Sequence, residues 1–134
     1  MTNKALLLLS CLVLTSFFSA NAQSIFTKWD QLSDYHDVMA ATFHPAEEGD
    51  VYPIKTRSVE LVKTGKKLVK GSIPAEFAST EMEDILKDLY KDSKALNKMI
   101  KKGKASDEQI KQGIIDLHEV FHQIVGLCKR EEHS

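Results

Sequence analysis

Apolar side chains recur at helical spacing in four successive stretches of this chain. The first stretch runs from about Thr27 to Phe43, and its apolar stripe recurs at alternating spacings of three and four residues. The stripe is formed by Trp29, Leu32, His36, Met39 and Phe43. Because Pro45 disfavours helical geometry at the residue before it, we expect this helix to end at His44.

The other three stretches carry recognisable start or stop signals. The second opens near Pro53, where a missing N–H costs nothing, and ends at Gly71. The third and fourth each begin with a capping box, Thr80 with Glu83 and Ser106 with Gln109. The predicted stripes are Ile54, Ser58, Leu61, Gly65 and Leu68 in the second, Met82, Ile85, Leu86, Leu89, Ser93, Leu96, Met99 and Ile100 in the third, and Ile110, Ile114, Leu117, Phe121, Ile124 and Cys128 in the fourth.

No stretch alternates apolar and polar residues as a half-buried strand would. Four one-sided helices joined by short connections favour an all-α fold, an antiparallel up-down-up-down four-helix bundle. The loop Ala46–Tyr52 is the one place where extra structure could lie.

The first 22 residues have the pattern of a cleaved signal peptide. Lys4 supplies a positive charge, an apolar stretch follows, and Ala20-Asn21-Ala22 is an A-x-A cleavage signature. The apolar stretch is too short to be a good membrane span. We therefore expect a periplasmic or secreted protein with one domain, residues 23–134.

A lipoprotein signal ending at Cys11 is the alternative to this cleavage site. It would leave only about six residues between Lys4 and the cysteine, which is short for the apolar part of a leader. The interpretation also ignores the cleavage signature before Gln23, so we expect cleavage at the downstream site.

The net charge argues against nucleic acid as a partner, and the cysteine content argues against an internal disulfide. The 134-residue chain has a formal net charge of −1, which becomes about −2 when Lys4 leaves with the leader. Such a near-neutral chain has no electrostatic footprint for nucleic acid. Cleavage also leaves Cys128 as the one remaining thiol, so no internal disulfide can form, although this cysteine could link two copies in a homodimer.

The histidines are concentrated in the first and last predicted helices, which are neighbours in an up-down bundle. His36 lies in the middle of the first stripe, where a buried imidazole needs polar partners. His118 and His122 are four residues apart and project from the same side of the last helix. At a rise of 1.5 Å per residue, His36 and His122 come to nearly equal heights, with His118 about 6 Å and His44 about 12 Å further along.

Imidazoles that converge in this way predict a transition-metal site, with zinc or copper as the expected ion. The candidate ligands are His36, His118 and His122, with His44 and Met39 as further candidates. A thioether from Met39 would favour copper, whereas an acid from the loop Ala46–Tyr52 would favour zinc or another divalent ion. The alternative is that His36 hydrogen-bonds a buried polar side chain while His118 and His122 face solvent.

His118, Glu119 and His122 also spell the H-E-x-x-H pattern of zinc peptidases. The pattern fixes only three residues, and the longer metzincin version fails here because Gly126 lies one position too late. The sequence contains no further catalytic motif. We therefore expect a protein without enzymatic turnover.

The stretch from Asp84 to Val125 resembles the second half of the soluble periplasmic four-helix-bundle cytochromes of the b and c′ types. The similar features are Ser93-Lys94-Ala95-Leu96, the turn from Lys101 to Lys104 around Gly103, and Phe121-His122-Gln123. No C-x-x-C-H motif is present, so covalent haem attachment of the usual kind is excluded. The resemblance implies a four-helix bundle, and for a haem-b protein it implies Met39 and His122 as axial ligands.

The sequence thus predicts an exported helical bundle that binds a transition-metal ion through histidines, for metal buffering, storage or sensing. A haem-b electron carrier that uses Met39 and His122 is the first alternative. A metal-free helical adaptor is the second.

Overall fold

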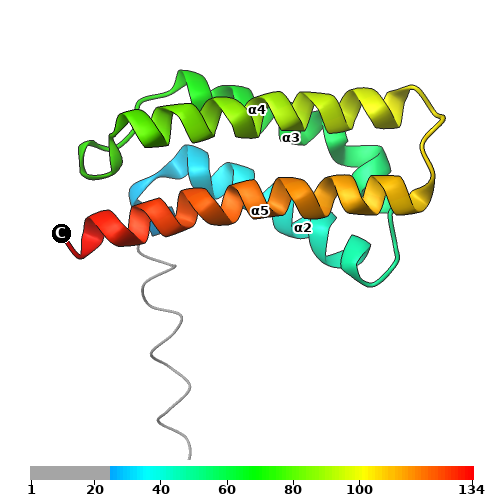
Figure 1. Ribbon diagram of the computed structural model, residues 1–134, viewed down its shortest axis with the longest axis horizontal. Coiled ribbons are helices and arrows are strands. Elements are labelled where there is room, and N and C mark those ends of the chain that lie inside the picture. Colours follow the sequence, from blue (N-terminus) through cyan, green and yellow to red (C-terminus); the bar gives the residue numbers. More distant parts are fainter. Residues whose placement is uncertain (1–24) are drawn as a thin grey trace, which may run out of the picture.

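Four long α-helices and one short 3-10 helix make up most of the part of the chain that a computed structural model describes, residues 25–134 (Figure 1). In chain order they are α2 (Asp30–Glu47), α3 (Tyr52–Lys70), η1 (Ala75–Phe77), α4 (Thr80–Lys101) and α5 (Asp107–Glu132). Residues 25–28 are also helical, and no strand occurs in residues 25–134. The prediction of an all-helical protein is confirmed for these residues. The predicted signal peptide, residues 1–22, lies outside them.

The helix boundaries follow mostly from local sequence signals. At the start of α5, the Ser106 side chain accepts a hydrogen bond from the Gln109 backbone, and the Gln109 side chain accepts one from the Ser106 backbone, as predicted. Pro53 lies in the first turn of α3, and Gly71 follows its last residue. The predicted cap of α4 is wrong by one residue. Ser79 rather than Thr80 is the N-cap, because the Ser79 hydroxyl accepts a hydrogen bond from the Met82 amide.

The first predicted helix differs from the structure at both ends. It is interrupted at Trp29, where the backbone leaves helical geometry, and it continues through Pro45 to Glu47 instead of ending at His44. Proline in the last turn costs a single intrahelical hydrogen bond. The extra turn buries Ala46 completely, and the core contacts of this residue favour continuing the helix.

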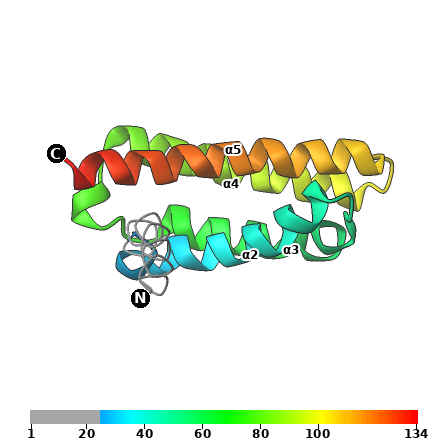
Figure 2. The ribbon, with the colours of Figure 1, turned by 90° about the horizontal axis from the view of Figure 1, so that it is seen from below.

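The long helices form two layers, with α2 and α3 in one layer and α4 and α5 in the other (Figure 2). Neighbours in sequence are neighbours in space, and α2 also packs against α5, so the set closes into a helical bundle. The predicted stripe of α3 is buried in full, and so is that of α5, which gains Leu127. In α4, five stripe residues are buried, whereas Ile85, Met99 and Ile100 are only partly buried.

Helices α2 and α5 make fewer contacts with each other than the long helices that follow one another in the chain do. They are the first and last long helices, and they carry most of the histidines. None of the helices described in residues 25–134 is long and apolar enough to cross a membrane.

Candidate functional site

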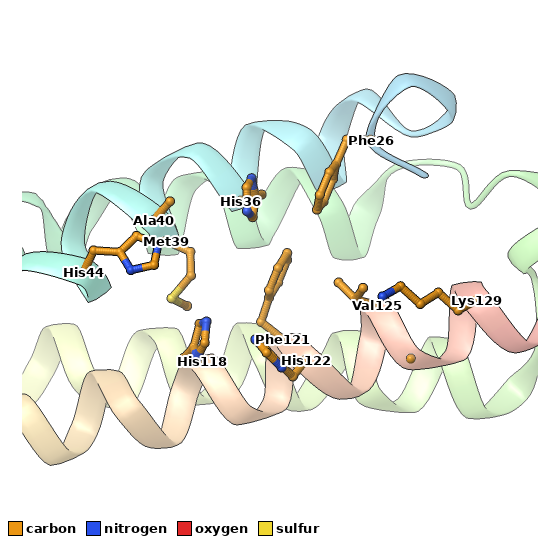
Figure 3. A pocket seen from close by; sticks show the side chains of 11 residues that line it. Phe26, His36, Met39, Ala40, His44, His118, Phe121, His122, Val125 and Lys129 are labelled. Atoms are coloured by element: carbon orange, nitrogen blue, oxygen red, sulfur yellow. The ribbon is translucent and has the colours of Figure 1, made fainter. Parts of the chain in front are cut away.

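A pocket of about 280 Å³ opens in the seam between α2 and α5. Figure 3 shows side chains from both helices directed into it, together with Phe26, which precedes α2. The lining residues are Phe26, His36, Met39, Ala40, His44, His118, Phe121, His122, Val125, Gly126 and Lys129. All five residues predicted as metal ligands are among them.

His36 lies at the edge of the core rather than inside it. The prediction that it is buried within the first stripe is wrong, since its side chain is 41 % exposed. Tyr35 occupies the core position instead and is fully buried. The imidazole of His36 stacks on Phe26 with ring centroids 4.4 Å apart, and it also faces Phe121 at 5.7 Å. Partial burial lowers the pKa of His36 below its ordinary value, and the nearby carboxylate of Asp37 opposes this effect.

His118 and His122 lie side by side on α5, as their spacing predicts. Their ring centroids are 4.3 Å apart, and the His118 ring stacks on Phe43 of α2 at 3.6 Å. His118 is half-buried, whereas His122 is exposed at the mouth of the pocket. Burial lowers the pKa of His118, and the positive charge that His122 acquires on protonation lowers it further. Both effects favour the neutral imidazole that a metal ion requires.

His44 stands near the C-terminal end of α2, and its ring points toward the pocket (Figure 3). Its Nδ1 lies 3.3 Å from Oε2 of Glu47, one turn further along the helix. A carboxylate that holds one ring nitrogen fixes the orientation of the imidazole and leaves Nε2 for a ligand. His44 is close enough to His36 and His118 to lower the pKa of both when it is charged.

Met39 is the one sulfur side chain among the described residues that line the pocket. It is completely buried, and its sulfur points from α2 across the seam toward His118 (Figure 3). The thioether therefore lies on the same side of the pocket as His44 and His118, on the inner wall rather than at the mouth.

His36 and His118 stack on phenylalanine rings, and His122 contacts the ring of His118. As the side chains stand, residues 25–134 contain no group of three or more histidine, cysteine or acidic side chains arranged to hold a metal ion. Phe26 and Phe121 hold His36, and Phe43 holds His118. These contacts are side-chain stacking without hydrogen bonds, so rotation about the side-chain bonds can bring ring nitrogens together without any change in the helices.

Six lining residues were not predicted from the sequence, among them Phe26, Ala40 and Gly126. The sequence contained a signal for two of these residues. Ala40 follows His36 by four residues and Gly126 follows His122 by four, and this spacing places each pair on one helix face. Phe26 gave no signal, since it lies beyond the helix break at Trp29. At Gly126 a Cβ would have no atom within 4 Å, so the missing side chain widens the mouth of the pocket.

Cys128 does not reach this site or the surface. It is completely buried in α5, and burial raises the pKa of its thiol to about 12. A thiol of this kind is inert, so it does not support the predicted link between two copies.

Comparisons of the chain with family models, with curated proteins and with solved structures found no match. The resemblance to four-helix-bundle cytochromes therefore stays a prediction from a few residues, such as Phe121-His122-Gln123.

Proposed function

We propose that this protein is exported and binds a transition-metal ion in the pocket between α2 and α5, for metal buffering, storage or sensing. The observation that carries the proposal is the composition of this pocket. It is lined by four of the five histidines in the chain and by a buried methionine.

Three further features support a metal ion as the ligand. Two imidazoles come from a rigid helix at a spacing of four residues, His118 and His122. A carboxylate is paired with His44, in the manner of an outer-shell partner of a metal ligand. The lowered pKa values of His36 and His118 keep these two rings neutral at pH 7.

The up-down-up-down topology and the exported location belong to the same proposal. The topology is supported by the order of helix packing and by the short connections 48–51 and 102–106. Export is supported by the A-x-A signature before Gln23. We propose no enzymatic turnover, since the two histidines of the H-E-x-x-H pattern lie in an open pocket with no catalytic motif beside them.

A haem-b carrier is the second candidate function, because Met39 and His122 both line the pocket. Its volume of about 280 Å³ speaks against this candidate. Pockets for drug-sized ligands have volumes of roughly 300–1,000 Å³, and a porphyrin needs a large one.

One preparation distinguishes these functions. The secreted chain, without a histidine tag, is purified, and its intact mass, elemental content and absorption spectrum are recorded together. We expect a chain that begins at Gln23, about one zinc or copper ion per chain and no Soret band. A Soret band would support haem instead, and a chain that takes up neither ion from an excess would overturn the proposed function.

Variants then test whether the pocket holds the ion. We expect His118→Ala to weaken ion binding by about tenfold or more. The matched control is His133→Ala, an exposed histidine beyond the end of α5, which should leave the affinity unchanged. Equal losses in the two variants would show that binding is nonspecific and lies outside the pocket.

A further inference from the structure

We infer that the pocket between α2 and α5 selects copper(I) over zinc(II), with the Met39 thioether as the selective ligand beside His44, His118 and His122. This inference rests on the proposed function, because it names the ion that the same pocket prefers.

The position of Met39 is the first observation. A methionine used only for packing would point into the apolar core, as Met82 of α4 does with equal burial. Met39 is also completely buried, yet it lines the pocket, and its sulfur faces His118 (Figure 3). Sulfur and imidazole donors therefore lie on one wall of one cavity.

The remainder of the lining provides the second observation. Among the described residues that line the pocket, none is a carboxylate, and the apolar ones include Phe26, Phe121 and Val125. Oxygen ligands suit hard divalent cations, whereas thioether and imidazole donors suit copper(I). A monovalent ion with neutral ligands also costs less to desolvate against apolar walls than a divalent ion does.

The arrangement of the histidines is the third observation. Glu47 engages Nδ1 of His44 from outside the pocket lining, which leaves Nε2 for the ion. His118 rests on Phe43 through stacking alone, so its ring can turn toward Met39 without breaking a hydrogen bond that the structure shows. His36 is held on Phe26 further along the seam, so we assign it to the wall of the site and not to the ligands.

The test compares two ions and two leucine variants. The untagged chain is titrated anaerobically with copper(I), against a chromogenic copper(I) chelator, and separately with zinc(II). We expect Met39→Leu to lower copper(I) affinity by roughly tenfold or more, equivalent to about 1.4 kcal/mol, with zinc(II) affinity unchanged. Met82→Leu, an equally buried methionine outside the pocket, should alter neither affinity.

Leucine replaces methionine at similar volume, so both variants should fold. X-ray absorption at the copper edge of the wild-type chain gives an independent result, in which we expect one sulfur scatterer among the nitrogen ligands. Copper(I) selection by Met39 would be overturned if the copper had nitrogen ligands alone, or if wild type and Met39→Leu bound copper(I) with equal affinity. In either case, zinc(II) binding in the pocket would still support the proposed function. Failure to bind either ion would overturn both.

Discussion

Tyr35 and His36 are neighbours in the sequence but face different parts of the molecule. The Tyr35 hydroxyl lies 2.9 Å from the Ser93 hydroxyl of α4, and its ring packs where Gly65 of α3 leaves space. His36 points instead into the seam with α5. Both positions fit the apolar stripe of α2. Tyr35 is the one that is buried, and Ser93 provides the hydrogen-bond partner that its buried hydroxyl needs.

The lowered pKa values of His36 and His118 predict how stability depends on pH. An unfolded chain protonates its histidines near pH 6.5, whereas these two rings protonate at lower pH when folded. Between the two values the unfolded state binds more protons, so acidification favours unfolding. We expect the contribution of these two histidines to the free energy of unfolding to be present in full above pH 6.5 and to be lost as the pH falls through their lowered pKa values.

Urea denaturation of the metal-free chain at pH 7.5 and at pH 5.5 measures this effect. The double variant His36→Gln, His118→Gln serves as the control, because it removes both titrating groups and should show a smaller difference between the two pH values. A difference as large as that of the wild-type chain would contradict the assignment to these histidines.

At the scale of an element, the start of α4 shows that a difference of one residue in the N-cap changes which side chains face the core. Ser79 and Thr80 both suit an N-cap, and Thr80 has Glu83 in the right place for a capping box. In the structure Ser79 has extended backbone geometry and accepts the bond from the Met82 amide, whereas Thr80 is the first helical residue. Met82 is completely buried, and starting α4 at Thr80 points its side chain into the core.

We therefore predict that Ser79→Ala lowers the free energy of unfolding by about 1 kcal/mol through loss of this cap. Thr80→Ala, at the adjacent exposed position, should change it by less than about 0.5 kcal/mol. Thermal or urea unfolding followed by circular dichroism gives both values. The reverse order of the two effects would mean that α4 begins one residue later.

At the scale of the whole molecule, the site occupies the place where the chain closes on itself. The histidines and Met39 of the site come from α2 and α5, and these two helices leave a pocket between them and make fewer contacts than the long helices that are sequential neighbours. An ion bound across this seam would tie the first long helix to the last. Binding should therefore be coupled to the stability of the whole bundle.

We predict that zinc(II) or copper raises the melting temperature of the purified chain. A ligand that binds only the folded state adds about 2.7 kcal/mol at a free concentration of 100 Kd. For a domain of this size the corresponding increase is roughly 10 °C. Calorimetry with and without the ion measures the shift, and magnesium is the control ion. Persistence of the full shift in the double variant His118→Ala, His122→Ala would place the ion elsewhere.

The sequence alone determined where the helices lie and much of which faces they bury, because helix capping and apolar periodicity depend on residues only a few positions apart. The stripe of α3 and the capping box at Ser106 depend on residues a few positions apart, and both were predicted correctly. The grouping of four histidines and Met39 in one seam was predicted from helical spacing within the first and last helices, together with the expectation that these two helices are neighbours.

Only the tertiary structure decided what lies between those histidines. Tyr35 took the core position in place of His36, Phe26 reached the pocket across the break at Trp29, and Phe43 came to stack on His118. Helical periodicity selects one side of a helix, but the choice among residues on that side depends on the shape and polar groups of the neighbouring helices. Those neighbours are distant in sequence, so no local pattern contains the answer.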